Sequence, residues 1–170
     1  MKKLVCIIFA LILFNACQEK EPQRYFSESA EIESSKKLVG YFASHDYEGI
    51  KEIYSDSVKI YDNSVNPMSL ADMITGMKAN EDMMEYMKVK DSSEYEMVLT
   101  KDNETWVNCW YTIVGKFKGP STEIVVPCHS TFQFKDGKVV KEYSYYNLLP
   151  VYQEMEKLSD TTAVDTMATK

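Results

Sequence analysis

The spacing of hydrophobic residues changes near the middle of the chain, from a helical period to the alternation typical of strands. Between residues 28 and 43 most apolar positions fall on one helical stripe, which predicts an amphipathic helix. Asp46 follows this stretch and is a suitable N-cap for a second, shorter helix. A short alternating segment at residues 58–61 then predicts a strand that ends at Asp62.

The first half closes with a third predicted helix, from Ser69 to Met87, that is rich in methionine. Ser69 and Asp72 fit the broad pattern of a capping box at its start. Methionines at helical spacing are commonly flexible core residues, and in some proteins they form the wall of an adaptable ligand pocket. Both alternatives stay open. The apolar positions are Leu70, Met73, Ile74, Met77, Met83, Met84 and Met87.

The second half contains four segments rich in β-branched and aromatic residues, separated by turn signals. The clearest turn is Asp136-Gly137, because Asp-Gly between alternating segments favours a two-residue hairpin. Four hairpin-linked strands predict an antiparallel sheet, and helices gathered on one side of it give an α+β fold. After the strands, residues 151–158 predict a last helical turn or two. The strands are expected at residues 95–100, 105–117, 122–134 and 138–146.

The N-terminus has the pattern of an export signal. Lys2 and Lys3 precede an apolar run over residues 4–14, which is too short for a membrane-spanning helix, since such a helix needs about 20 residues. Ala16-Cys17 follows, and a small residue before a cysteine resembles the lipobox read by lipoprotein signal peptidase. We therefore expect residues 1–16 to be removed and Cys17 to carry the lipid. The alternative is an ordinary secretory signal with an incidental cysteine.

This signal determines the predicted organisation and location. Residues 17–27 form the lipidated tether, residues 28–158 form one domain of common size, and the polar residues 159–170 form a disordered tail. Lipid on Cys17 places the domain in the cell envelope, at the outer membrane and on its periplasmic or surface face. The membrane is thus an expected partner, reached through the lipid.

Composition narrows the remaining functions. The formal net charge is −7 and no basic run occurs, which argues against nucleic acid as a partner. No spacing typical of a metal site and no glycine-rich phosphate loop occurs in the sequence, so we expect neither a metal nor another cofactor. Cys109 and Cys128 remain for the folded domain. Either they form a disulfide or they are free, and we expect them free, because cross-strand neighbours rarely meet disulfide geometry.

Three segments carry a resemblance to a known superfamily. They are residues 42–50, which form a helix–turn–helix with a His-Asp corner, residues 53–62, which run into the first strand, and the hairpin at residues 132–140. Their order and spacing resemble the nuclear transport factor 2-like superfamily, especially its SnoaL-like branch, over residues 38–147. The resemblance implies a cone-shaped fold, in which a curved antiparallel sheet packs on three N-terminal helices around a pocket. It leaves the function open, because the superfamily includes isomerases, dehydratases, polyketide cyclases and adaptors.

The same resemblance singles out Asp62. In ketosteroid-isomerase-like members the end of the first strand carries a catalytic carboxylate, and Asp62 falls on that position. A carboxylate at the mouth of an apolar cavity has a raised pKa and serves better as a general base near neutrality. The simpler alternative is a strand-ending Asp that forms an Asx turn. The tyrosine donor of those isomerases is replaced by Leu38, and His129 is a further candidate as an acid–base partner of Asp62.

Three functions remain open for the domain. The leading prediction is a membrane-anchored lipoprotein that binds a small apolar ligand in the pocket without catalysis. The second is an isomerase, cyclase or dehydratase that uses Asp62 as base. The third is an adaptor that forms a homodimer or docks through an aromatic sheet face. The pocket wall is expected to contain Leu38, Tyr61, Met73, Met77, Trp110 and Phe132.

Overall fold

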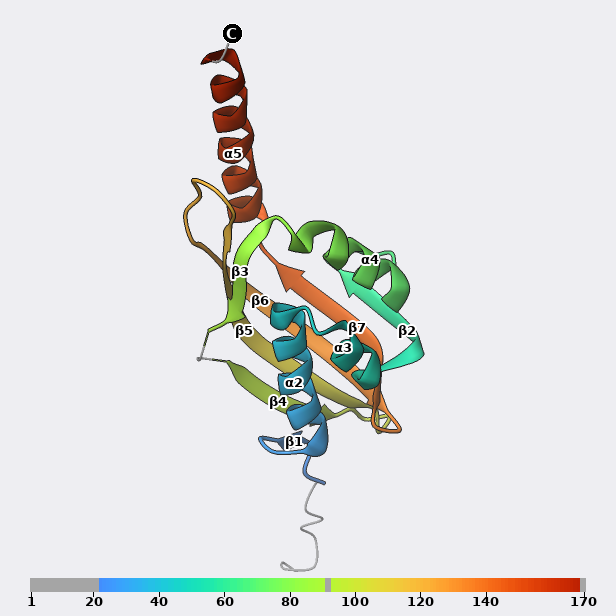
Figure 1. Ribbon diagram of the computed structural model, residues 1–170. Helices are drawn as coiled ribbons and strands as arrows, with labels where there is room; N and C mark the ends of the chain where they lie inside the picture. Colours follow the sequence, from blue (N-terminus) through green and yellow to red (C-terminus); the bar gives the residue numbers. More distant parts are fainter. Residues whose placement is uncertain (1–21, 91–92, 169–170) are drawn as a thin grey trace, which may run out of the picture.

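The computed structural model describes residues 22–90 and 93–168 of the chain, with side chains as far as residue 159 (Figure 1). The predicted signal and Cys17 lie outside the described residues. The elements follow the order β1 (Tyr25–Phe26), α2 (Ala30–Ser44), α3 (Tyr47–Ile53), β2 (Tyr54–Asp62), α4 (Leu70–Glu81), β3 (Met84–Val89), β4 (Glu94–Leu99), β5 (Thr105–Phe117), β6 (Ile124–Lys135), β7 (Lys138–Tyr146) and α5 (Leu149–Ala168).

The first two helices begin and end where local side-chain chemistry allows. Ser29 caps α2 by accepting the backbone N–H of Ile32 at 3.1 Å. His45 ends α2 in the left-handed conformation, with φ 55°, and turns the chain toward α3. Asp46 caps α3 by accepting the N–H of Gly49 at 3.0 Å, which confirms the predicted N-cap.

The predicted third helix is shorter than expected. Ser69 and Asp72 form the predicted capping box, but α4 ends at Glu81 and not at Met87. Residues 84–89 form strand β3 instead, antiparallel to β5. The methionine spacing fits a helix, yet the second half of the β5 edge, which β4 leaves unpaired, offers backbone hydrogen bonds. Tertiary pairing with that edge decides the conformation of the segment.

The seven strands form one sheet, and β5 is its longest member. β4 pairs with the first half of β5 and β3 with the second half of the same edge. β6 and β7 follow as antiparallel neighbours, whereas β2 pairs with β7 in parallel. The expected sheet was antiparallel throughout, so this parallel edge pair corrects that detail. The sheet is curved and unclosed, and the α+β class is confirmed.

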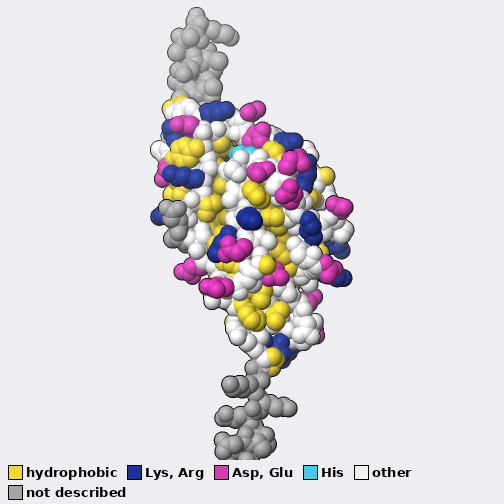
Figure 2. Space-filling view, turned by 60° about the horizontal axis from the view of Figure 1, so that its bottom comes forward, with side chains coloured by type: hydrophobic (Ala, Val, Ile, Leu, Met, Phe, Trp, Pro, Cys, Tyr) yellow, Lys and Arg dark blue, Asp and Glu magenta, His cyan; other side chains and the backbone are white. Residues whose placement is uncertain are grey.

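Helices α2, α3 and α4 cover one face of the sheet (Figure 1). The main core lies between this face and α2, where Ile32, Leu38, Val107 and Phe132 are at most 1% exposed. On the face of the molecule shown in Figure 2, hydrophobic side chains gather in the middle and charged ones of both signs lie around them.

Both ends of the predicted domain differ in detail from expectation. Two residues assigned to the tether form β1, which pairs with β4. The last helix, α5, extends to Ala168, beyond the helical turns predicted up to residue 158 and through most of the expected disordered tail. Among the described residues, no helix is long and apolar enough to cross a membrane.

Candidate functional site

A cavity of about 290 Å³ lies on the helix-covered face of the sheet, near the ends of β2 and β7. Its wall is mostly apolar and draws on α2, α4, α5 and on strands β2, β3, β5, β6 and β7. The apolar lining consists of Phe42, Ile60, Met73, Met77, Met87, Ile113, Val126, Leu148 and Val151. The polar lining consists of Asp62, Tyr111, Cys128, Glu142, Ser144 and Tyr146. The polar groups thus come largely from two neighbouring strands.

Asp62 lies at the end of β2 and faces this cavity. Its Oδ2 accepts a hydrogen bond from the Tyr146 hydroxyl at 2.7 Å. Burial raises the pKa of the Asp62 carboxyl, and the hydrogen bond from Tyr146 lowers it in part. The same burial and the charge of Asp62 raise the pKa of the Tyr146 hydroxyl. Tyr146 therefore stays protonated and can act as a donor.

Glu142 of β7 is the second carboxyl in the cavity, and it is only 4% exposed. Its Oε2 accepts a hydrogen bond from the Tyr54 hydroxyl and its Oε1 accepts one from Ser144 at 2.5 Å. Burial raises the pKa of Glu142 to about 7, the two hydrogen bonds oppose this rise, and the charge of Asp62 adds to it. At neutral pH this carboxyl is therefore divided between its protonated and ionised forms.

A chain of hydroxyl groups extends from Glu142 across the sheet. The Ser144 hydroxyl lies 2.7 Å from that of Ser130. The Ser130 hydroxyl in turn lies 3.0 Å from the hydroxyl of Tyr111 on β5. Such a chain holds the side chains in fixed positions and links both ends of the polar wall.

Glu142 is absent from the site residues predicted from the sequence, although its spacing from Ser144 and Tyr146 could have indicated it. Glu142, Ser144 and Tyr146 alternate along β7, so they face the same side of the sheet. A register shift between Gln133 and Phe134 changes which residues of β7 stand opposite β6, and this shift is invisible in the sequence.

We call the space of about 290 Å³ the inner cavity. It continues into an adjoining chamber of about 470 Å³. The two share Met77, Met87 and Tyr146 as lining residues. Its other lining includes His45 at the end of α2 and Glu81 at the end of α4, and the Glu81 carboxylate accepts a hydrogen bond from Tyr47. A ligand of the inner cavity thus has room to extend toward α5.

Four of the expected pocket residues lie elsewhere. Met73 and Met77 line the inner cavity. Leu38 and Phe132 are fully buried in the core between α2 and the sheet, so placing them in the pocket wall was wrong. Tyr61 stacks on Tyr143 at 4.6 Å between ring centroids, on the opposite face of the sheet. Tyr61 adjoins Asp62 in one strand, and alternation prevents both from facing the same cavity.

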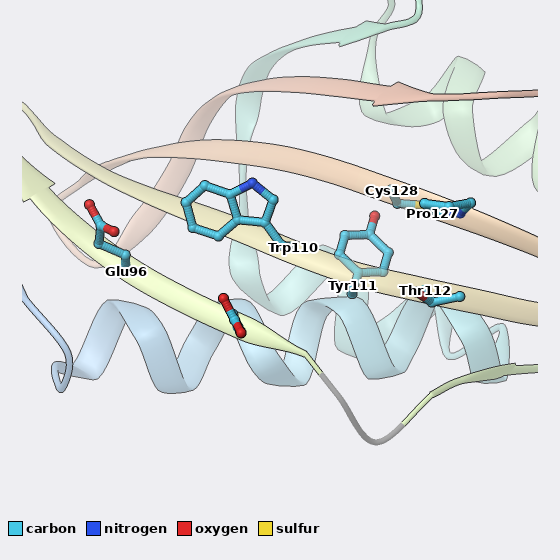
Figure 3. A pocket seen from close by; sticks show the side chains of 7 residues that line it. Glu96, Trp110, Tyr111, Thr112, Pro127 and Cys128 are labelled. Atoms are coloured by element: carbon cyan, nitrogen blue, oxygen red, sulfur yellow. The ribbon is translucent and has the colours of Figure 1, made fainter.

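Trp110 and His129 also lie on the opposite face, and the proposed pairing of His129 with Asp62 was wrong. The two rings stack at 5.1 Å, and Trp110 is 42% exposed. Trp110 borders a depression of about 510 Å³ on β4, β5 and β6, which Glu94, Glu96, Thr112 and Pro127 help to line (Figure 3). Tyr111 and Cys128 border both this depression and the inner cavity. Since the His129 ring stacks on Trp110, it has no access to the carboxyls on the other side.

Cys109 and Cys128 are free in the structure, as expected. Cys109 is buried in the core, and Cys128 lines the inner cavity. Burial raises the pKa of the Cys128 thiol to about 11, which keeps it protonated and unreactive near neutrality. Within the part of the chain that the structure describes, no group of three or more His, Cys, Asp or Glu side chains is placed to hold a metal ion.

Comparison with known proteins supports the architecture. No family profile and no curated protein matches the sequence. Among solved structures, an NTF2-like protein of unknown function from Burkholderia pseudomallei K96243 is 9% identical, with a TM-score of 0.59 over 75% of this chain and 98% of that chain. The chain has a nuclear transport factor 2-like fold.

Two further structures give the same result for this nuclear transport factor 2-like domain. A candidate SnoaL-like polyketide cyclase from Shewanella denitrificans OS-217 is 11% identical, with a TM-score of 0.59 over 76% of this chain and 99% of that chain. A hypothetical protein with a ketosteroid isomerase-like fold from Catenulispora acidiphila DSM 44928, in complex with trimethylamine, is 16% identical, with a TM-score of 0.56 over 72% and 91%. At these identities the likeness establishes the fold alone.

Proposed function

We propose that the protein is a membrane-anchored lipoprotein whose SnoaL-like domain binds a small, largely apolar ligand in the inner cavity. The observation that carries this proposal is a cavity with an apolar wall and polar groups that converge at one end, from Asp62, Glu142, Ser144 and Tyr146. Ligand sites in proteins commonly combine these two features, because burial of apolar surface supplies affinity and a few polar groups fix orientation.

The methionines give the cavity its adaptability. Met73 and Met77 of α4 and Met87 of β3 are part of the apolar lining of the cavity. Their unbranched side chains change shape at low cost, so the cavity accepts apolar bodies of differing outline. The hydrogen-bonded carboxyls and hydroxyls on β2 and β7 form the rigid side, which selects the polar group of the ligand.

Binding of a neutral fluorescent probe tests the proposal. N-phenyl-1-naphthylamine is larger than the inner cavity alone and is expected to fill it together with the adjoining chamber of about 470 Å³, with increased fluorescence. Met77→Trp places a larger side chain where the two chambers meet and is expected to weaken this binding at least tenfold. Val125→Trp is the matched control, because Val125 is 49% exposed on the other face of β6.

The outcomes separate the two faces of the sheet. Weaker binding in Met77→Trp alone supports the inner cavity as the site. No binding to the wild-type protein, or an equal loss in both variants whose thermal midpoints match that of the wild type, overturns the proposal.

The second candidate function is catalysis with Asp62 as general base. The specific observation in its favour is that Asp62 lines a mostly apolar cavity and that its Oδ2 lies 2.7 Å from the Tyr146 hydroxyl. In such a reaction Asp62 takes a proton from the carbon beside a ligand carbonyl; the electron pair of the broken C–H bond forms a C=C bond, and the π pair of the C=O bond moves to the oxygen. A hydroxyl of the polar wall then donates a hydrogen bond to that oxygen.

Deuterium exchange distinguishes catalysis from binding. A ketone that displaces the fluorescent probe is incubated with the protein in D₂O, and exchange at the carbon beside its carbonyl is followed by NMR. Catalysis predicts exchange above the buffer rate that Asp62→Asn abolishes while probe binding persists. Exchange at the buffer rate with the wild-type protein contradicts the enzymatic candidate and leaves the binding proposal intact.

The anchoring half of the proposal concerns Cys17. It is supported by the charged start, the apolar run over residues 4–14 and the small residue before the cysteine. Mass spectrometry of the membrane fraction is expected to find a mature chain that begins at acylated Cys17. Cys17→Ser is expected to move the protein out of that fraction. A mature N-terminus elsewhere would contradict lipidation.

A further inference from the structure

The charge balance inside the cavity points to the kind of polar group that a ligand carries there. Asp62 and Glu142 both line the inner cavity, and its described lining contains no Lys, Arg or His. Asp62 stands opposite Ser144, and Glu142 stands opposite Ile60, so the two carboxyls are diagonal neighbours on one face of the β2–β7 pair. Two acids therefore share an apolar space without a basic side chain of the protein.

The other elements around the cavity do not supply the missing positive charge. α4, β3, β5 and β6 contribute methionines, aliphatic side chains, Cys128 and the Tyr111 hydroxyl. In the adjoining chamber the titratable groups are His45, Glu81, Tyr146 and Tyr152, and His45, at the end of α2, is the one basic side chain of the described lining; it does not line the inner cavity. Glu81 adds a further acid to the lining of the adjoining chamber.

The partners that the carboxyls do have are neutral. Tyr146 donates to Asp62, and Tyr54 and Ser144 donate to Glu142. Hydroxyl donors reduce the free-energy cost of burying a carboxylate, but they do not neutralise its charge. An ionised carboxylate in an apolar wall is most stabilised by a cation with N–H donors, which forms charge-assisted hydrogen bonds.

The rest of the wall suits the same kind of ligand. Phe42, Tyr111 and Tyr146 contribute aromatic rings to the lining, and such rings attract a cation through their faces. The space of about 290 Å³ holds roughly ten non-hydrogen atoms, at about 30 Å³ for a water-sized volume. An anionic ligand, in contrast, would meet two carboxyls without a compensating charge.

We propose that the inner cavity selects an organic cation, an amine of roughly ten non-hydrogen atoms whose ammonium group contacts Asp62 and Glu142. Its apolar body lies against Met73, Met77 and Met87. This inference rests on the proposed binding function and specifies the class of ligand. It also predicts that binding draws a proton off Glu142, because a neighbouring cation lowers the pKa of a carboxyl.

Three probes of one skeleton test the inference on the purified protein by calorimetry: 2-phenylethylamine, 2-phenylethanol and phenylacetate. The amine is expected to bind at least tenfold more tightly than the alcohol at pH 7.5, and phenylacetate is expected not to bind. Repeating the titration of the amine in two buffers of different ionisation enthalpy is expected to show proton release. The affinity for the amine is expected to rise between pH 6 and pH 8 as Glu142 ionises.

Variants assign the preference to the two acids. Asp62→Asn and Glu142→Gln are each expected to reduce the preference for amine over alcohol by at least fivefold. Glu96→Gln, on the other face of the sheet, is the matched control and is expected to leave it unchanged. The wild-type proton release needs no variant, so the test does not depend on how well the variants fold.

The results separate this inference from the proposed function. Equal binding of amine and alcohol overturns the selection of a cation, and amine binding without proton release overturns the role of Glu142 as an acid that gives up its proton to the bound cation. Failure of both phenylethyl probes to bind, while the neutral fluorescent probe binds in the cavity, also overturns the selection of a cation and leaves the binding function standing. Failure of every probe overturns the binding function itself.

Discussion

Replacing Glu142 by Gln tests whether the cavity holds a buried acid that changes protonation near neutral pH. Burial raises the pKa of Glu142 from 4.5 to about 7. Below pH 4.5 the folded and unfolded states both hold this proton. Between pH 4.5 and 7 only the folded state holds it, so the free energy of unfolding falls as the pH rises.

The size of the effect follows from the two pKa values. At about 1.4 kcal/mol per pH unit, this carboxyl removes about 3 kcal/mol of stability between pH 4.5 and 7. The amide in Glu142→Gln has nearly the same shape, stays neutral and can still accept from Tyr54 or Ser144. The variant is therefore expected to gain about 3 kcal/mol relative to the wild type as the pH rises from 4.5 to 8.

The assay is urea unfolding followed by tryptophan fluorescence at pH 4.5, 6, 7 and 8. Glu52→Gln is the control, because Glu52 is exposed on α3 and its replacement is expected to give a difference that does not change with pH. The pKa of Asp62 is also raised, so Asp62 adds a smaller fall in the free energy of unfolding with rising pH. This contribution is present in the wild type and in both variants. A constant difference between Glu142→Gln and the wild type across this pH range would refute a buried, partly protonated Glu142.

The remaining predictions concern packing, capping and assembly. Phe132→Ala removes a fully buried ring and is expected to cost about 3–5 kcal/mol in urea unfolding; a cost below 1 kcal/mol would contradict its place in the core. Ser69→Ala removes the capping box of α4 and is expected to cost about 1 kcal/mol, and an unchanged midpoint would speak against the cap. In Gly115→Ala the new Cβ would lie 2.8 Å from Met84 and 3.2 Å from the Tyr86 carbonyl, so a loss of about 1–3 kcal/mol is expected, and a neutral effect would contradict the close contact of β3 with β5. The homodimer stays a prediction, and light scattering is expected to give twice the mass of one chain.

Local signals predicted much of the fold. Asp46 and Ser69 were recognised as caps because capping depends on a few adjacent residues. The Asp136-Gly137 turn joins β6 and β7 as expected, since both of its residues have positive φ. Elements that depend on distant partners are harder to predict: the spacing up to Met87 predicts helix, and the pairing of β3 with β5 leaves no local mark in the sequence.

The candidate site was likewise only partly predictable, because it too depends on residues that are distant in the sequence. The position of Asp62 followed from a resemblance, and the structure places it in the lining of a mostly apolar cavity. Tyr61 and Trp110 were assigned to the wrong face, because both faces of the sheet carry large apolar residues and alternation alone does not say which face is covered. Glu142 could be grouped with Ser144 and Tyr146 by alternation, but only the packing of helices over that face makes it buried.

The parallel pairing of β2 with β7 has a consequence for how the chain folds. The hydrogen bond between Tyr54 and Glu142 joins residues that are 88 positions apart in the sequence. Contacts of such long range form late, because closing a long loop costs entropy before the contact is gained. During synthesis β2 emerges well before the strand that completes its edge. A chain that stops short of β7 therefore loses Glu142 and the partner of β2 together, so the acid-lined cavity cannot form before β7 is in place.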